Sequence, residues 1–232
     1  MPRRKKTTTE IISCQDLIKT YLSGKIETPV LRGVEVSIKQ GEFVAIMGKS
    51  GAGKSTLMYQ LSALDHPTSG TIVVDGRNLE ELSSRERTEF RLQCLGYVFQ
   101  DYALLPELRA HENVSLPLLM QGYDHDTAYE KSVAALEAVG LGERTDNKPS
   151  QLSGGEQQRV SIARAIAHNP KVLFADEPTA NLDSVSSKKV LDVFTKLHKE
   201  GLTIVMVTHE REYARYAERT IYLKDGEVVS RL

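Results

Sequence analysis

Four short apolar runs alternate with longer amphipathic stretches along the chain. The runs occupy residues 43–47, 97–99, 172–175 and 203–207. Nearly continuous apolar runs of this length are typical of strands in a parallel sheet that is covered on both faces. Because helical stretches separate these strands, the pattern predicts an open, mostly parallel α/β sheet.

Two of the intervening stretches have apolar residues at helical spacing and a glycine at the end. In the first, Tyr129, Val133 and Leu136 precede Gly140. The second runs over residues 190–197 and ends before a glycine at position 201. A glycine directly after such a stretch is a common helix stop, so each stretch predicts one amphipathic helix.

Two other runs end in Asp-Gly, a pair that favours a two-residue hairpin turn. Residues 71–74 precede Asp75-Gly76, and residues 221–223 precede Asp225-Gly226. We expect the first hairpin to form a small antiparallel β layer beside the parallel core, and the second to close the chain.

Length and charge limit how the chain can be organised. A chain of 232 residues suits one large domain, which we place at residues 10–232 with an inserted helical subdomain at about residues 88–167. Residues 1–9 carry four consecutive cationic side chains at positions 3–6. We expect a flexible basic tail there, with a weak membrane-surface contact as the alternative. The formal net charge of -1 argues against broad attraction to nucleic acid.

Cysteine usage and hydropathy indicate a reduced, cytosolic setting. Cys14 and Cys94 form neither a C-x-x-C pair nor a metal-binding spacing. The basic start continues into polar residues rather than the apolar segment of a secretory leader. No apolar stretch approaches the ~18 residues that cross a bilayer. We therefore expect a soluble protein whose membrane role comes through a partner.

A phosphate-binding loop follows the first predicted strand and precedes a helical run. It matches G-x-x-x-x-G-K-[ST] with Gly48, Lys49, Ser50, Gly51, Ala52, Gly53, Lys54, Ser55 and Thr56. The glycines let backbone N–H groups point at phosphate oxygens, and the helix N-terminus adds a partial positive charge. We expect Lys54 to reach the β- and γ-phosphates, Ser55 to bind Mg²⁺ and Thr56 to contact the α-phosphate region. A plain glycine-rich turn is the alternative.

Polar side chains follow three further predicted strands. Asp176 and Glu177 come directly after residues 172–175, and two adjacent carboxylates there are costly unless positive charge faces them. We expect Asp176 to hold the Mg²⁺ of a nucleotide, and Glu177 to orient or deprotonate the attacking water. Gln100 and His209 also follow strands, so all of these groups should meet at one sheet edge. Gln100 would contact Mg²⁺ or the attacking water, and His209 would contact the γ-phosphate. The alternative is that each residue has only a structural role, which is the more common case for a single Gln or His after a strand.

A second anion-binding element is predicted at residues 153–156. Ser153 and Glu156 form a capping box, S-x-x-E, that starts a helix. Gly154 and Gly155 weaken a helix start, and nothing in the local sequence demands them. A helix N-terminus without side chains favours anions. Because the first loop already holds one set of phosphates, we expect this element to serve a second nucleotide.

Residues 152–159, Leu-Ser-Gly-Gly-Glu-Gln-Gln-Arg, resemble the signature motif of the ATP-binding cassette transporters. The resemblance extends from about residue 10 to the end of the chain. It implies a P-loop NTPase-type fold, ATP and Mg²⁺ as cofactors, and two subunits paired head to tail. Each ATP would then lie between the phosphate loop of one subunit and the signature helix of the other.

The resemblance also implies roles for single residues. Gln100 matches the Q-loop, Asp176 the Walker B aspartate, Glu177 the catalytic base and His209 the switch histidine. Residues 180–183 are similar to the D-loop, with Asp183 near the nucleotide, and Tyr21 sits where the family places an aromatic that stacks on adenine. Lys49 and Asn181 depart from the commonest pattern, and neither removes a catalytic group.

A narrower resemblance concerns residues 104–106, 112–114 and 116–119, which are similar to the lipoprotein-release, macrolide-export and cell-division subfamily. A helical surface broken by proline is the alternative. The subfamily implies an ATPase on the inner face of the cell membrane that drives a separate permease, as an exporter or mechanotransmission system. An ATP-gated scaffold or signalling cassette is the second hypothesis. Action on DNA or ribosomes is disfavoured by the net charge of -1 and the single cassette.

Overall fold

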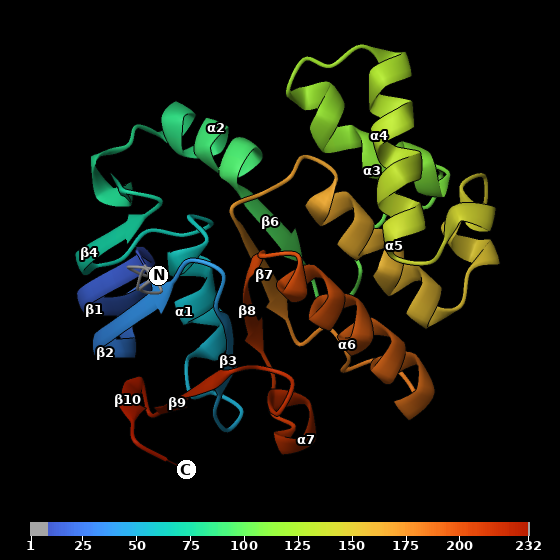
Figure 1. The fold of residues 1–232 in the computed structure, drawn as a ribbon. Helices are drawn as coiled ribbons and strands as arrows, with labels where there is room; N and C mark the ends of the chain where they lie inside the picture. The colour runs from blue at the N-terminus through green and yellow to red at the C-terminus, as the bar shows by residue number, and fades with distance from the viewer. Residues whose placement is uncertain (1–8, 232) are drawn as a thin grey trace, which may run out of the picture.

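A computed structural model describes residues 9–231, which form two sheets flanked by helices (Figure 1). Apart from Thr9, the predicted basic tail lies outside the described residues. The larger sheet has the strand order β10-β9-β3-β8-β7-β6, and only β10 is antiparallel to its neighbour. Its strands are β3 (Phe43–Met47), β6 (Leu95–Val98), β7 (Val172–Asp176), β8 (Thr203–Val207), β9 (Arg219–Lys224) and β10 (Glu227–Val229).

The central strands are buried on both faces, as the apolar runs predicted. Every residue of β3, β7 and β8 is buried. Along β7 the side chains alternate between two cores: Phe174 packs into one hydrophobic cluster, and Leu173 and Ala175 pack into another. This alternation is the period-two geometry of a strand inside a covered sheet. The prediction for residues 97–99 is displaced, since β6 ends at Val98.

The second sheet is antiparallel, with the order β2-β1-β4-β5. Its strands are β1 (Glu10–Ser23), β2 (Ile26–Lys39), β4 (Ser69–Val74) and β5 (Arg77–Asn78). Both predicted Asp-Gly turns are confirmed, since Asp75 (φ 48°) and Gly76 (φ 74°), like Asp225 (φ 49°) and Gly226 (φ 84°), adopt left-handed conformations. The long β1–β2 hairpin was not predicted, because shifts of register in its pairing interrupt the alternation of apolar and polar residues.

Helices cover both faces of the larger sheet (Figure 1). They are α1 (Lys54–Leu61), α2 (Ser84–Cys94), α3 (Ala110–Met120), α4 (His125–Ala138), α5 (Gly154–Ile166), α6 (Ser184–Lys199) and α7 (Arg211–Ala214), with 3₁₀ turns at Leu79–Glu81, Gly142–Arg144 and Pro149–Gln151. The two helices predicted from spacing correspond to α4 and α6. Within residues 9–231, no helix has the length and apolar character that crossing a bilayer requires.

Helices α3, α4 and α5 pack against one another and form the helical group at the upper right of Figure 1. Helix α2 lies apart from this group. Its Arg87 and Arg91 donate hydrogen bonds to the carbonyls of Asp65 and Ala63, which follow α1. The predicted lower boundary at residue 88 therefore falls inside α2, and we propose α3–α5 as the content of a helical subdomain.

Close packing of β6 against α5 yields a first prediction. A Cβ on Gly96 would lie 2.3 Å from the carbonyl oxygen of Ala165, which is rigid helix backbone. We expect Gly96→Ala to lower the free energy of unfolding by about 1–3 kcal/mol, measured by urea denaturation. Gly142→Ala is the control, because its Cβ would first meet the flexible side chain of Glu137, at 3.0 Å. Equal effects of the two substitutions would contradict the packing argument.

Candidate functional site

The carboxyl ends of four neighbouring parallel strands form one polar edge. The phosphate loop follows β3, and His209 follows β8. Asp176 ends β7 and Glu177 follows it, while Gln100 lies just after β6. Ligands of open α/β sheets bind at this kind of edge. The structure therefore brings together the groups that the sequence predicted to converge.

The phosphate loop curls back on itself between β3 and α1. Gly53 is left-handed (φ 98°) and precedes α1 without any side-chain cap, so the first N–H groups of the helix are not used by side chains. Lys54 is buried, and its Nζ donates to the carbonyl of Lys49 at 3.2 Å. The side chains of Lys49 and Ser50 are exposed. Such a loop, with a cation folded across it and free helix N–H groups, is suited to phosphate.

Ser55 and Asp176 meet at the start of α1 and the end of β7. The Ser55 hydroxyl donates to Oδ1 of Asp176 at 3.1 Å. Burial raises the pKa of Asp176, the Ser55 hydrogen bond lowers it, and the neighbouring Glu177 carboxylate raises it again, with a raised pKa as the net result. A buried carboxylate paired with a hydroxyl fits Mg²⁺, which prefers oxygen ligands and keeps several waters.

A metal at this point would need further ligands from phosphate and water. Within residues 9–231 there is no group of three His, Cys, Asp or Glu side chains that could hold a metal. Gln100 is exposed, and in the described part of the chain its side chain makes no hydrogen bond. Its role as a metal ligand therefore stays a prediction.

Glu177 lies between two other predicted site residues. Its Oε2 is 3.0 Å from Nδ1 of His209, and its Oε1 is 3.9 Å from Nζ of Lys54. The backbone of Glu177 is left-handed (φ 42°), and its N–H donates to the carbonyl of Val207 at the end of β8. Strained backbone of this kind is concentrated at functional sites. The carboxylate is thus held beside the phosphate loop in an orientation fixed by a neighbouring strand.

The signature residues lie on the other face of the sheet from α1. Leu57 and Met58 of α1 belong to one core, whereas Val160 and Ile162 of α5 belong to the other. Within the described residues, no hydrogen bond or ion pair joins positions 153–156 to the phosphate loop. The predicted capping box is present: Ser153 Oγ accepts from the Glu156 N–H, and the Glu156 carboxylate accepts from the Ser153 N–H.

The two glycines of the signature motif have a structural reason that the sequence did not reveal. A Cβ on Gly154 would lie 2.9 Å from Oη of Tyr102, and a Cβ on Gly155 would lie 2.8 Å from Cβ of Ser186. Nothing in the local sequence demands these glycines, as expected, and the demand comes instead from residues distant in sequence. They let the start of α5 pack closely against the segment after β6 and the first turn of α6.

The segment after β6 connects the site to α5 and to the loop before α6. Arg164 of α5 donates to the carbonyls of Ala103 at 2.6 Å and Tyr102 at 3.0 Å. Both of these residues have positive φ angles, of 50° and 62°. On the other side, Asn181 donates to the carbonyl of Gln100 at 3.2 Å. The backbone of residues 100–103 is therefore held from two sides, by α5 and by the loop before α6.

The sequence prediction missed Arg164 and Tyr102. Burial lowers the pKa of Arg164, and among the described residues the guanidinium has no carboxylate partner. A signal did exist, because Arg164 lies between Ala163 and Ala165 on a helix whose apolar residues face the core.

The sequence prediction also gave Tyr97 no role in the site. Its hydroxyl is buried with no hydrogen-bond partner in the described region, and burial and the nearby Asp176 raise its pKa.

Two other predicted ligand residues have partners of their own. Asp183 caps α6, where Oδ1 accepts from the N–H groups of Val185 and Ser186, each at 2.9 Å. Tyr21 on β1 is 40% exposed, and its hydroxyl donates to Oδ2 of Asp65 at 3.0 Å. The structure thus places Tyr21 close to the end of α1, the helix that begins in the phosphate loop.

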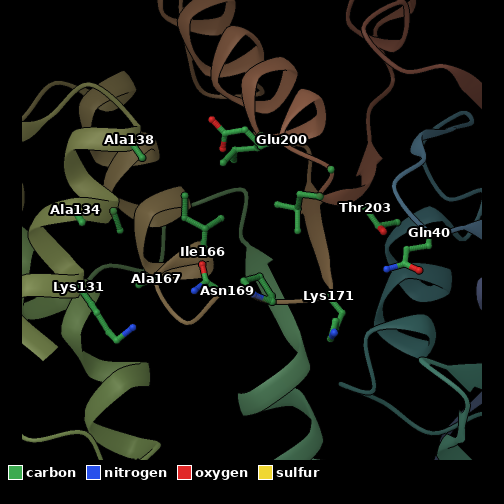
Figure 2. Close-up of a pocket in the computed structure, with 15 residues that line it drawn as sticks. Gln40, Lys131, Ala134, Ala138, Ile166, Ala167, Asn169, Lys171, Glu200 and Thr203 are labelled. Carbon is green, nitrogen blue, oxygen red and sulfur yellow. The ribbon is translucent and has the colours of Figure 1, made fainter. Parts of the chain in front are cut away.

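One cavity lies away from this site. Its volume is about 570 Å³, and Figure 2 shows Gln40, Lys171 and Thr203 on its wall beside residues of α4 and α5. Gln40 precedes β3, Lys171 precedes β7, and Thr203 begins β8, so the cavity is at the amino ends of the strands. Ligands of open parallel sheets bind at the opposite edge.

Comparison with known proteins gives a consistent result. The family model described as ABC transporter matches residues 31–180. The lipoprotein-releasing system ATP-binding protein LolD of Aquifex aeolicus is 49% identical over 203 residues, covering 88% of this chain and 91% of LolD. The macrolide export ATP-binding/permease protein MacB of Syntrophobacter fumaroxidans is 48% identical over 222 residues. That match covers 94% of this chain and spans about a third of MacB, 31%.

Solved structures agree with the sequence relatives. A dimeric structure of the ATP-binding cassette MJ0796 in a post-hydrolysis state, bound to ADP and Pi, has a TM-score of 0.87 and 42% identity. A further dimeric structure of MJ0796, described as a bacterial ABC transporter cassette, has a TM-score of 0.87 and 43% identity. Each match covers 94% of this chain and 96% of the other. The predicted α/β fold, with its small antiparallel sheet, is confirmed.

The packing of the signature glycines can be tested with a double-mutant cycle. We expect Gly155→Ala to lower the free energy of unfolding by about 1–3 kcal/mol, because the added methyl group meets Ser186. Adding Ser186→Gly should recover part of this loss, with a coupling free energy of at least about 0.5 kcal/mol. Urea denaturation of the four proteins measures the coupling. Additive effects would show that Ser186 is not what demands a glycine at position 155.

Proposed function

This chain belongs to the ABC transporter family, and from that premise we propose that it is the ATP-binding and ATP-hydrolysing subunit of a transporter. Two subunits would enclose ATP between them and drive a separate transmembrane permease. The observation that carries the proposal is the Glu177 carboxylate, held 3.0 Å from His209 and 3.9 Å from Lys54 beside the Ser55–Asp176 pair. Phosphoryl transfer to water requires a base, cationic or hydrogen-bonding groups that contact the phosphate, and oxygen ligands for a metal ion. Glu177, then His209 and Lys54, and finally Ser55 with Asp176 would supply these parts.

In this proposal, residues 48–56 bind the triphosphate through backbone N–H groups and Lys54. Ser55 and Asp176 hold Mg²⁺, with Gln100 close to it, and the bound ion would neutralise charge on the β- and γ-phosphates. Nζ of Lys54 lies 3.9 Å from Oε1 of Glu177, a long ion pair. An anionic phosphate would compete for Lys54, which leaves the Glu177 carboxylate free to accept a hydrogen bond from water.

Glu177 is proposed as the base that orients the attacking water, and His209 as the group that senses the γ-phosphate. Nδ1 of His209 lies 3.0 Å from Oε2 of Glu177. The Nε2 nitrogen on the other side of the ring would then hydrogen-bond to the γ-phosphate. The Glu177 contact would orient the ring toward the phosphate, and His209 would link the state of the nucleotide to the end of β8.

A second subunit completes the site. Among the hydrogen bonds and ion pairs of residues 9–231, none joins residues 153–156 or Asp183 to the phosphate loop of the same chain. We therefore infer that they face the nucleotide of the partner. The N-terminus of α5 would bind the γ-phosphate side of that ATP through its N–H groups. The dimeric MJ0796 structures, one of them with ADP and Pi, support this arrangement.

The permease and the location are inferred from the relatives. The chain covers 91% of LolD, a protein named as the ATP-binding component of a releasing system, but only 31% of MacB, whose name includes a permease. We infer that this chain corresponds to the ATP-binding part, which acts with a transmembrane permease at the cytoplasmic face of the membrane. The same relatives favour an export or mechanotransmission system. Nucleic acid is not an expected partner.

Glu177→Gln tests the proposed base. The amide keeps the shape of the side chain but cannot accept a proton, so we expect ATP turnover to fall at least about a hundred-fold. ATP and magnesium should then accumulate a closed dimer, measured by light scattering beside a phosphate-release assay. Glu212→Gln, an exposed change on α7, is the control. Turnover within a few-fold of wild type would exclude Glu177 as the base.

Lys54→Ala tests nucleotide binding. Removal of the buried ammonium takes away the cation that crosses the phosphate loop, so ATP affinity should fall at least about ten-fold. Titration with a labelled ATP analogue measures the change directly. Lys199→Ala removes an exposed lysine at the end of α6 and should leave affinity unchanged. A similar loss in both variants would mean that overall charge, not the loop, governs binding.

A further inference from the structure

One carboxylate oxygen, Oδ2 of Asp65, gathers three side chains just beyond α1. It lies 2.8 Å from Nζ of Lys19, 3.0 Å from Oη of Tyr21 and 3.0 Å from Nε2 of Gln60. We propose that Asp65 is the positioning residue that fixes Tyr21 as the stacking platform for the base of the bound nucleotide. This inference rests on the proposed function and assigns a role to Asp65, Lys19 and Gln60 within it.

The cluster joins two parts of the fold that handle different parts of a nucleotide. Lys19 and Tyr21 are two residues apart on β1, so their side chains lie on the same face of the antiparallel sheet. Gln60 is in α1, the helix whose first residue is Lys54 of the phosphate loop. By binding both elements, Asp65 sets the distance between the Tyr21 ring and the phosphate site.

Asp65 is itself held in place by its neighbours. Its Oδ1 accepts from the N–H of His66 at 2.7 Å, and its carbonyl accepts from Arg87 at 2.9 Å. Burial alone raises the pKa of Asp65, but hydrogen bonds from Lys19, His66 and Tyr21 outweigh it and lower the pKa. The charged carboxylate can only accept hydrogen bonds, so the Tyr21 hydroxyl is the donor and the orientation of the ring is defined.

The two faces of the Tyr21 ring are not equivalent. Nζ of Lys19 lies 4.7 Å from the ring centroid, and the Lys19 side chain is only 11% exposed because Asp65 and the carbonyl of His66 hold it. Tyr21 remains 40% exposed. A base can therefore stack only on the face that Lys19 leaves open, and the cation on the far face keeps the ring from turning.

The Tyr21 hydroxyl also lies next to the phosphate-binding helix. Burial raises the pKa of Tyr21, the Asp65 hydrogen bond raises it further, and the hydroxyl of Thr56 lowers it. Thr56 is the third residue of α1. The Tyr21 platform is thus close to Thr56, the residue predicted to contact the α-phosphate region. This closeness is required because the base of a nucleotide is joined to its α-phosphate through the ribose.

The experiment compares ATP with inorganic tripolyphosphate, which has the phosphates but no base. Isothermal titration calorimetry in the presence of magnesium measures both affinities for wild type, Asp65→Asn and Tyr21→Phe. We expect Asp65→Asn to lose roughly ten-fold in ATP affinity, and Tyr21→Phe to lose a few-fold, because each breaks the bond that orients the ring. Tripolyphosphate affinity should stay within about two-fold. Asp126→Asn, an exposed change on α4, is the matched control.

Each alternative outcome has a distinct meaning. Equal losses for ATP and tripolyphosphate in Asp65→Asn would show that Asp65 merely supports α1, and would overturn the platform. Unchanged ATP affinity in both variants would also overturn it. Retained tripolyphosphate binding shows that the variants are folded. If wild type binds neither ligand, the proposed function itself fails, and the platform fails with it.

Discussion

Parallel pairing of β3, β8, β7 and β6 is the constraint on which the rest of the structure depends. It places the carboxyl ends of four strands side by side, so that a helix N-terminus, two carboxylates, a histidine and a glutamine share one edge. The strands that end there are buried on both faces, which fixes their register. A site assembled from strand ends in this way is rigid where the phosphates bind. Movement is then expected in the segments that follow the strands rather than in the strands themselves.

The segment after β6 is held by α5 and by the loop before α6. The carbonyls of residues 100, 102 and 103 accept hydrogen bonds from Asn181 on one side and Arg164 on the other. Gly154 and Gly155 bring the start of α5 against the same region and against α6. A displacement of the segment after β6 must therefore also move α5 or the loop before α6. This gives a physical route between the edge of the sheet and the helical group α3–α5.

The antiparallel sheet has a separate role. It packs into the same core as α1, and Asp65 joins its first strand to that helix through Lys19, Tyr21 and Gln60. The phosphates and the base would thus be recognised by elements of different sheets. The Asp65 carboxylate would fix the distance between these elements. Residues 153–156, the proposed third part of the site, lie on the opposite face of the larger sheet from α1. That location supports the proposal that a partner chain completes the contacts to the triphosphate.

The sequence by itself determined the features that depend on near neighbours. The apolar runs located the central strands to within a few residues, because buried parallel strands need apolar side chains on both faces. The Asp-Gly pairs located both hairpin turns, and Ser153 and Glu156 located the start of α5, because turn and cap geometry are set within four residues. The phosphate loop was found for the same reason, since its backbone shape is local.

Tertiary structure decided what depends on residues far apart in the chain. Tyr21 and Asp65 are separated by 44 positions, and Arg164 and Ala103 by 61. No local pattern encodes such pairs, since folding brings them together only when the sheets and helices pack. The same reason explains why the glycines at 154 and 155 looked unnecessary in the sequence, and why the register shifts hid the β1–β2 hairpin. Short motifs identified the residues expected to perform the chemistry. Tertiary packing determined how the side chains of these residues are oriented.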